Sequence, residues 1–198
     1  MLLEFTVENY RSFLKKKTLV LEADKALKEC SDTNLSDCNK YTLLRSLALY
    51  GANSSGKSNI VSAMHTMASS VLLSVKLNDN DELDYDPFLL LKGNNRPTMF
   101  EVVFLKGKYC YRYGFRYNRE QIVDEWLFRK TTPRSKELMM FVRDEEGIFV
   151  EESNFPEGVG CEEKTNDNRV FMSAIGRRMF PSGNFLVSIR FQHYFRLE

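Results

Sequence analysis

The sequence is poor in the residues that build metal centres and disulfide frameworks. Its 198 residues include two histidines, His65 and His193, and four cysteines. The cysteines are Cys30, Cys38, Cys110 and Cys161. No two of them have a C-x-x-C spacing, and neither histidine is close to a cysteine in the sequence. This distribution argues against a structural zinc site and against a secreted disulfide scaffold, so we expect reduced thiols in a cytoplasmic protein.

The sequence also lacks long apolar runs and a strong charge of either sign. No run approaches the roughly 18 apolar residues of a membrane span, and the N-terminus has no basic segment followed by an apolar stretch. Lys and Arg number 28 against 27 Asp and Glu, which gives a formal net charge of +1. No membrane partner is therefore expected. The balance excludes a polybasic nucleic-acid tail but leaves open a local basic face that contacts DNA.

What is present is a series of strand and helix patterns. Alternation of apolar and polar residues predicts strands at Leu3 to Val7, at Thr18 to Leu21 and in an antiparallel meander from about Thr98 to Glu152. Apolar residues at helical spacing predict an amphipathic helix from Lys57 to about Val75. A second helix is expected at about 168–178. The polar residues 29–40, which follow the second predicted strand, are expected to form an exposed excursion.

One motif carries recognisable chemistry. Residues 51–58 fit G-x-x-x-x-G-K-[ST], the phosphate-binding loop, after the apolar run 47–50 that is expected to be a strand. Gly51 and Gly56 permit backbone angles and a close approach that let N–H groups point at phosphate oxygens. Lys57 places a cation against the β- and γ-phosphates and Ser58 offers a hydroxyl to Mg²⁺. The helix that follows presents its positive N-terminal end.

Two further patterns each have a functional and a structural interpretation. Asp144 and Glu145 follow an apolar strand and imitate the acidic residues that hold Mg²⁺, but D-E-E-G before Ile-Phe-Val is typical of a hairpin turn. The aromatic residues at alternate positions 109–117 could stack on bases beside Arg112 and Arg116, or form the buried face of a sheet. We favour the structural interpretation of both. The run of lysines 15–17 is expected to be a solvated turn, with contact to a phosphate backbone as its alternative.

Two segments together resemble a known family. They are Phe5-x-Val7-Glu8-Asn9-Tyr10-Arg11-Ser12-Phe13 and Tyr50-Gly51-Ala52-Asn53-Ser54-Ser55-Gly56-Lys57-Ser58-Asn59. The pair resembles the N-terminal lobe of ABC-type ATPase heads of the SMC/RecF/OLD kind. More narrowly, it resembles the AAA-family ATP-binding proteins of prokaryotic abortive-infection and phage-defence loci. The strands at Pro97–Glu101, Tyr111–Phe115 and Glu125–Leu127 fit the same family, and the resemblance extends from Met1 to about Arg190.

The resemblance implies a set of binding residues. In that family the opening strand and its turn lie near the nucleotide, which would bring Arg11 and Ser12 to the phosphates or to the adenine side. The set expected to bind Mg·ATP is Arg11, Ser12, Gly51, Ala52, Asn53, Ser54, Ser55, Gly56, Lys57, Ser58 and Asn59. Ser58 is also the expected metal ligand.

Other parts of such a head are not found in the sequence. The family also needs a signature motif, a Walker B strand ending in Asp-Glu and a switch histidine, all in a C-terminal lobe. There is no L-S-G-G-like stretch, and no acidic strand precedes His193. Gln121 and Gln192 are the available glutamines for a contact with Mg²⁺ from between the lobes, and neither is favoured. We therefore expect half a head: a truncated form, a natural short form or a chain completed by a partner.

The expected fold class is α/β, with a strand, P-loop and helix followed by an antiparallel meander and a mostly helical C-terminal stretch. We expect one N-terminal lobe over residues 1–198. Its parts are the opening strands, P-loop and helix in 1–78, the meander in 79–152, and a helical or irregular segment in 153–198 that leads to a C-terminal lobe.

The sequence thus predicts an ATP-binding lobe whose complete protein hydrolyses ATP between two heads. The chain alone is expected to bind Mg·ATP without efficient turnover. Expected partners are nucleotide, a second head or a partner that supplies the second lobe, a toxin or nuclease effector, and DNA. Two alternatives stay open. One is a non-catalytic, nucleotide-responsive dimerisation or interaction module, and the other is a self-sufficient small NTPase that uses Asp144 and Glu145.

Overall fold

The computed structural model describes residues 1–24 and 31–179. Cys30, Gln192 and His193, like the rest of the expected C-terminal segment from residue 180 on, lie outside the described residues. None of the helices in the described part of the chain is long and apolar enough to cross a membrane.

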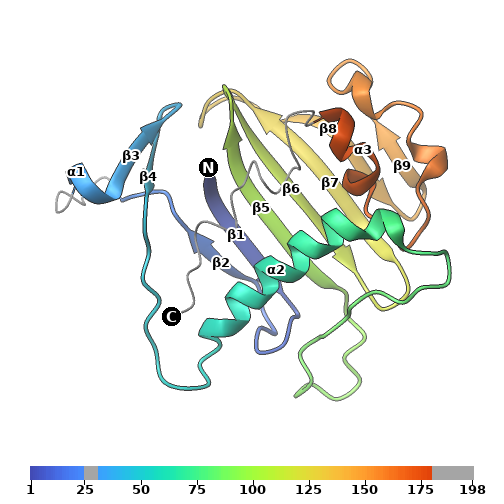
Figure 1. Ribbon diagram of the computed structural model, residues 1–198, viewed down its shortest axis with the longest axis horizontal. Coiled ribbons are helices and arrows are strands. Elements are labelled where there is room, and N and C mark those ends of the chain that lie inside the picture. The colour runs from blue at the N-terminus through green and yellow to red at the C-terminus, as the bar shows by residue number, and fades with distance from the viewer. Residues whose placement is uncertain (25–30, 180–198) are drawn as a thin grey trace.

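A seven-stranded antiparallel sheet forms the body of the protein (Figure 1). Its strands, in spatial order, are β2 (Lys17–Val20), β1 (Leu2–Glu8), β5 (Thr98–Lys106), β6 (Tyr109–Tyr117), β7 (Ile122–Lys130), β8 (Leu138–Asp144) and β9 (Gly147–Val150). The antiparallel meander predicted from the sequence is confirmed, and β1 extends it by pairing with β5, where Phe5 lies opposite Val102. The protein is therefore an α/β structure with a mostly antiparallel sheet and few helices.

Strand β1 is buried on both faces, whereas its alternating pattern predicted one buried face. Five of its residues are 3% exposed or less: Leu2, Leu3, Phe5, Thr6 and Val7. The second cover comes from a hairpin of β3 (Leu35–Cys38) and β4 (Tyr41–Leu44), which follows a short helix, α1 (Ser31–Asn34). Leu3 packs in a small apolar cluster with Tyr41 and Leu43 of that hairpin.

The described part of the polar segment 29–40 is largely exposed, as expected from its composition, but it has regular structure. Residues 31–40 contain α1, β3 and the start of the hairpin turn. Asn39 and Lys40 turn the chain with positive φ angles of 50° and 71°, as both central residues of a type I′ hairpin turn require. Turn geometry and packing on β1 thus gave this polar sequence a regular structure.

Helix α2 (Lys57–Leu73) lies across one face of the sheet (Figure 1). Its buried residues are Ile60, Ala63, Met64, Met67 and Val71, at the helical spacing that predicted the element. The helix ends two residues before Val75, which lies in a following 3₁₀ turn (Ser74–Lys76) and is exposed.

The aromatic stripe of β6 faces α2 and is core. Tyr113, Phe115 and Tyr117 are at most 2% exposed. The Phe100 ring of β5 lies 5.9 Å from that of Phe115 and 5.8 Å from that of Tyr117, between ring centroids. Because stacking on a base needs an open aromatic face, the base-binding alternative for this stripe is wrong, and the interpretation as a buried sheet face is confirmed.

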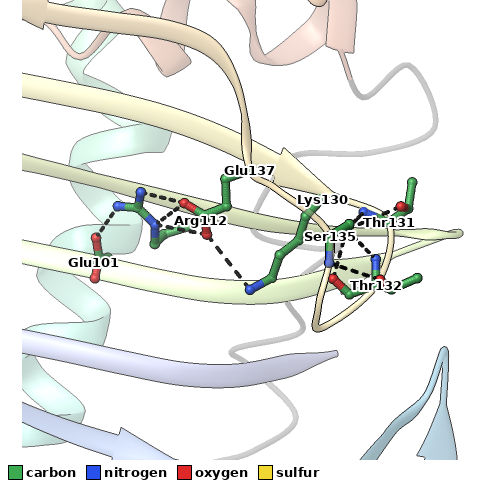
Figure 2. Close-up of polar contacts among 7 residues, drawn as sticks. All are labelled: Glu101, Arg112, Lys130, Thr131, Thr132, Ser135 and Glu137. Carbon is green, nitrogen blue, oxygen red and sulfur yellow. Dashed lines mark hydrogen bonds and ion pairs between the residues drawn. The ribbon is translucent and has the colours of Figure 1, made fainter.

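The opposite face of the sheet carries a charged cluster (Figure 2). Arg112 of β6 donates to Glu137 at 2.7 Å and to Glu101 at 3.1 Å, and Lys130 lies 3.9 Å from Glu137. The hydrogen bonds from the Arg112 guanidinium lower the pKa of Glu137. Trp126, also on this face, donates its indole N–H to Glu101 at 2.9 Å.

The last described element, α3 (Phe171–Met179), is held by a buried carboxylate. The predicted helix at about 168–178 is confirmed with a later start. Glu125 of β7 accepts the backbone N–H of Phe171 at 2.6 Å, that of Met172 at 2.9 Å and the hydroxyl of Tyr113 at 2.9 Å. Burial raises the pKa of Glu125. Two 3₁₀ turns, Pro156–Gly158 and Glu162–Lys164, connect β9 to this helix.

Candidate functional site

The loop at residues 51–56 stands in front of α2 with two residues in the left-handed conformation. Gly56, directly before the helix, has φ 93° and Ser54 has φ 64°. Such a conformation favours glycine because a Cβ is strained there. Residues Gly51 to Ser55 are exposed, so the loop lies open at the N-terminal end of the helix.

Both glycines of the motif also lie close to serine side chains. A Cβ on Gly51 would lie 2.8 Å from the Ser55 hydroxyl oxygen. A Cβ on Gly56 would lie 2.7 Å from the hydroxyl oxygen of Ser12 and 3.5 Å from the ring of Phe13. The loop is therefore a cradle that side chains would fill, as the sequence motif predicted for its glycines.

Lys57 spans this cradle. Its ammonium donates to the carbonyl oxygens of Gly51 and Ala52, each at 2.8 Å. These acceptors are neutral, so an anion placed at the loop would compete for the cation with a stronger, charge-assisted hydrogen bond. The N-terminal end of α2, which begins at Lys57, adds the positive end of its helix dipole beside the loop.

A tight turn from the opening strand reaches the loop. Tyr10 and Phe13 exchange two backbone hydrogen bonds, of 2.9 and 2.7 Å, which place Arg11 and Ser12 at the tip. Ser12 accepts a hydrogen bond from the Asn59 amide at 2.8 Å. The structure thus brings the predicted residues Ser12, Gly56 and Asn59 together, although 47 positions separate Ser12 from Asn59.

Arg11 points to a residue that the sequence did not single out. Its guanidinium Nε lies 2.6 Å from Asp86 Oδ2, and this hydrogen bond raises the pKa of Arg11. The backbone N–H of Arg11 also donates to the carbonyl of Asp86 at 2.9 Å. Asp86 lies in an irregular loop without periodicity, so no sequence signal marked it.

A hollow of about 470 Å³ lies where these segments meet. Its lining residues are Arg11, Ser12, Asn59, Asp86, Pro87, Phe88, Leu89 and Leu90. Three of them, Arg11, Ser12 and Asn59, belong to the residue set that the sequence predicted. The other five come from the loop before β5, which the sequence analysis missed.

The apolar run before the loop is not a strand in the structure. Residues 46–50 have no strand partner among the described residues. Leu47 is 44% exposed, Leu49 is 41% exposed and Tyr50 is 90% exposed. The predicted strand, loop and helix arrangement is thus present only as loop and helix, because a strand needs a neighbour with which to exchange backbone hydrogen bonds.

Asp144 and Glu145 are far from the loop. They belong to the β8–β9 hairpin, in which Asp144 pairs with Gly147, so the hairpin interpretation is confirmed. The loop contacts the turn after β1, and β8 lies four strands away, about 19 Å at the usual spacing between strands. Asp144 and Glu145 therefore cannot hold a metal ion at the loop. Gln121 is exposed in the turn before β7 and lines no part of the hollow.

Ser58 is exposed on the first turn of α2, at the place predicted for a metal ligand. Over the ranges 1–24 and 31–179, no three His, Cys, Asp or Glu side chains are grouped so that they could hold a metal ion. Mg²⁺ commonly takes one or two protein ligands together with substrate phosphates. The single Ser58 hydroxyl beside the exposed loop is compatible with this mode of Mg²⁺ coordination.

Comparison with known proteins names the family. A family model described as "AAA domain, putative AbiEii toxin, Type IV TA system" matches residues 46–157, more than half of the chain. The search of curated proteins found no match. The matched region contains the loop, α2 and most of the sheet. An AAA domain implies a nucleotide-binding, ATPase-like function. The chain belongs to this AAA family of abortive-infection type.

Proposed function

We propose that the domain binds Mg·ATP through residues 51–59, as the nucleotide-binding lobe of an ABC/SMC-like ATPase. The observation that carries the proposal is the cradle in which Lys57 bonds to the carbonyls of Gly51 and Ala52. Backbone N–H groups and the ammonium would bind the β- and γ-phosphates, and the Ser58 hydroxyl would hold the Mg²⁺ that neutralises them. The near-neutral net charge is compatible with phosphate binding, because the binding groups would be the backbone N–H groups and the ammonium of the loop itself.

We also propose that hydrolysis requires a second lobe. Support comes from apolar surface that the described residues leave bare. Besides Leu47 and Leu49, Leu73 at the end of α2 is 50% exposed and Val75 in the 3₁₀ turn after it is 46% exposed. A further lobe whose strands pair with residues 46–50 would bury Leu47 and Leu49, and it would bring the acidic residue and the signature motif. A second copy in a head-to-head dimer, or a partner chain, would supply the opposing surface.

The biological setting proposed is a cytoplasmic defence system against phage. Support comes from the family description, which names an abortive-infection toxin of the toxin–antitoxin kind. In that setting the nucleotide cycle would gate a toxin or nuclease effector, or act on DNA. The other candidate is a non-catalytic module whose oligomeric state responds to ATP.

Replacing Lys57 by alanine tests the proposal. ATP affinity measured by calorimetry should fall by about 100-fold, the loss expected when charge-assisted hydrogen bonds worth about 3 kcal/mol are removed. Lys76→Ala, at the exposed far end of the same helical segment, is the matched control and should bind ATP like the wild type. Unchanged ATP affinity in Lys57→Ala would sink the proposal.

Turnover separates the remaining candidates. Steady-state hydrolysis by this chain alone should stay at background and rise when the second lobe is supplied. If ATP changes the oligomeric state and hydrolysis stays at background even in the complete protein, the non-catalytic module is correct. The third alternative, a small NTPase that uses Asp144 and Glu145, is opposed by the distance of these residues from the loop. It would predict loss of turnover in Asp144→Asn.

A further inference from the structure

The hollow beside the loop has features that phosphate binding does not use. Its volume of about 470 Å³ falls within the range typical of small-ligand sites. Part of its lining is apolar and part carries a carboxylate, and neither attracts a phosphate. We propose that this hollow holds the nucleoside half of the nucleotide, with Asp86 accepting hydrogen bonds from the ribose hydroxyls and Leu90 covering the base. This inference rests on the proposed function of the loop.

The first support is the continuity of the hollow with the phosphate cradle. Asn59 follows Ser58 on the first turn of α2 and lines the hollow. Its amide donates a hydrogen bond to Ser12, whose hydroxyl oxygen would lie 2.7 Å from a Cβ placed on Gly56. A triphosphate seated at the N-terminal end of α2 therefore has the hollow as its direct continuation on the side of the β1 turn.

The second support is the lip of the hollow. Leu89 is 78% exposed and Leu90 is 88% exposed, which is unusual for side chains whose burial is favourable. The loop that carries them is fixed at both ends. Tyr117 donates to the carbonyl of Asp84 at 3.0 Å, and Asn9 donates to the carbonyl of Arg96 at 2.5 Å. A flat base against this lip would bury apolar surface without requiring the loop to order first.

The third support is the chemistry of Asp86. A carboxylate only accepts hydrogen bonds, so it selects hydroxyl or amino donors and repels phosphate. Its Oδ2 binds Arg11, whereas Oδ1 makes no hydrogen bond to any described residue. The pairing holds the carboxylate in one orientation at the wall of the hollow. The planar guanidinium of Arg11 lies on the same wall, where it can stack on a base.

The test compares ATP with inorganic triphosphate, which uses the cradle alone. The wild type should bind ATP about 100-fold more tightly than triphosphate, through the added contacts of the nucleoside. Asp86→Ala and Leu90→Ser should each weaken ATP about tenfold and leave triphosphate affinity unchanged. Retained triphosphate binding shows at the same time that each variant is folded. Lys57→Ala should weaken both ligands.

The ribose contact has its own readout. The wild type should prefer ATP to 2′,3′-dideoxy-ATP about tenfold, and Asp86→Ala should abolish that preference. Glu82→Ala, which removes another exposed, ion-paired carboxylate, and Leu138→Ser, which changes another exposed leucine, are the matched controls. Equal affinity of the wild type for ATP and triphosphate would overturn the inference and leave the loop's function intact. Binding of neither ligand would overturn both.

Discussion

The sheet and the segment before α2 differ in the burial of their apolar side chains. In the sheet, Phe100, Tyr113 and Phe115 are fully buried and packed ring against ring. By contrast, every residue from Arg45 to Ser55 is exposed, and three of them are large apolar side chains. The free energy of folding therefore comes from the sheet and α2, while the loop at residues 51–56 contributes little. Residues of this exposed segment can be altered without unfolding the protein.

The largest effect should come from the aromatic core. Phe100→Ala should lower the free energy of unfolding by about 3–5 kcal/mol, because it removes a ring packed against several others. Tyr50→Ala, the corresponding change in the exposed segment, should alter it by less than about 0.5 kcal/mol. Urea unfolding monitored by circular dichroism measures both. A large loss in Tyr50→Ala would contradict the contrast between the two regions.

The attachment of α3 to the sheet should come next. Glu125→Ala leaves the N–H groups of Phe171 and Met172 and the Tyr113 hydroxyl without their acceptor. We expect a loss of about 3 kcal/mol, the size seen when buried donors lose their partner. Hydrogen exchange should accelerate first in α3. Glu82→Ala, which removes an exposed carboxylate, should leave both stability and exchange unchanged, and similar behaviour of the two variants would refute the role of Glu125.

A smaller effect is expected at the loop, and it should appear in binding as well as in stability. Gly56→Ala and Gly147→Ala both place a Cβ at a positive φ, of 93° and 126°. Each should cost about 1–2 kcal/mol in backbone strain. Only Gly56→Ala meets a neighbour, Ser12, so only this variant should also weaken ATP binding. If calorimetry shows equal ATP affinity in the two variants, the proposal that close contact between Gly56 and Ser12 shapes the ATP site is wrong.

The smallest effect should come from the charged cluster in Figure 2. Glu137→Gln should cost about 0.5–1 kcal/mol at pH 7, the range for a partly exposed ion pair with several hydrogen bonds. Because Arg112 lowers the pKa of Glu137 in the folded state, this stability is present above the unfolded pKa near 4.5 and is lost as the pH falls through the lower folded value. Urea unfolding at pH 7 and pH 3 should show the difference shrink on acidification.

The elements that depend on neighbouring residues could be predicted from the sequence. A glycine-rich loop before a helix, α2 itself, the meander and the β8–β9 turn each follow from local spacing, and the structure contains them all. The family resemblance found in the N-terminal residues and the loop also agrees with the family match. The aromatic stripe of β6 was also correctly predicted to be the buried face of the sheet, because aromatic residues at alternate positions favour a half-buried strand.

Contacts between distant residues explain what was missed. Asp86 and Leu90 carry no periodic signal, and they reach the candidate site only because Asn9 and Tyr117 hold their loop against the sheet. Residues 47–50 have the composition of a strand, but they pair with no strand among the described residues. The sequence of the hairpin of β3 and β4 predicts a polar loop in its first part, yet the hairpin packs on Leu3 and buries the second face of β1.

By itself, the sequence determined which groups the loop carries, because its glycines, lysine and serine supply backbone freedom, a positive charge and a hydroxyl within eight consecutive positions. Only the tertiary structure decided what lies beside that loop. The turn after β1 places Ser12 against Gly56, and the loop before β5 places Asp86 against Arg11, 75 positions away. The reason is physical: local motifs are encoded by neighbours in the chain, whereas the walls of a hollow are set by how the sheet packs.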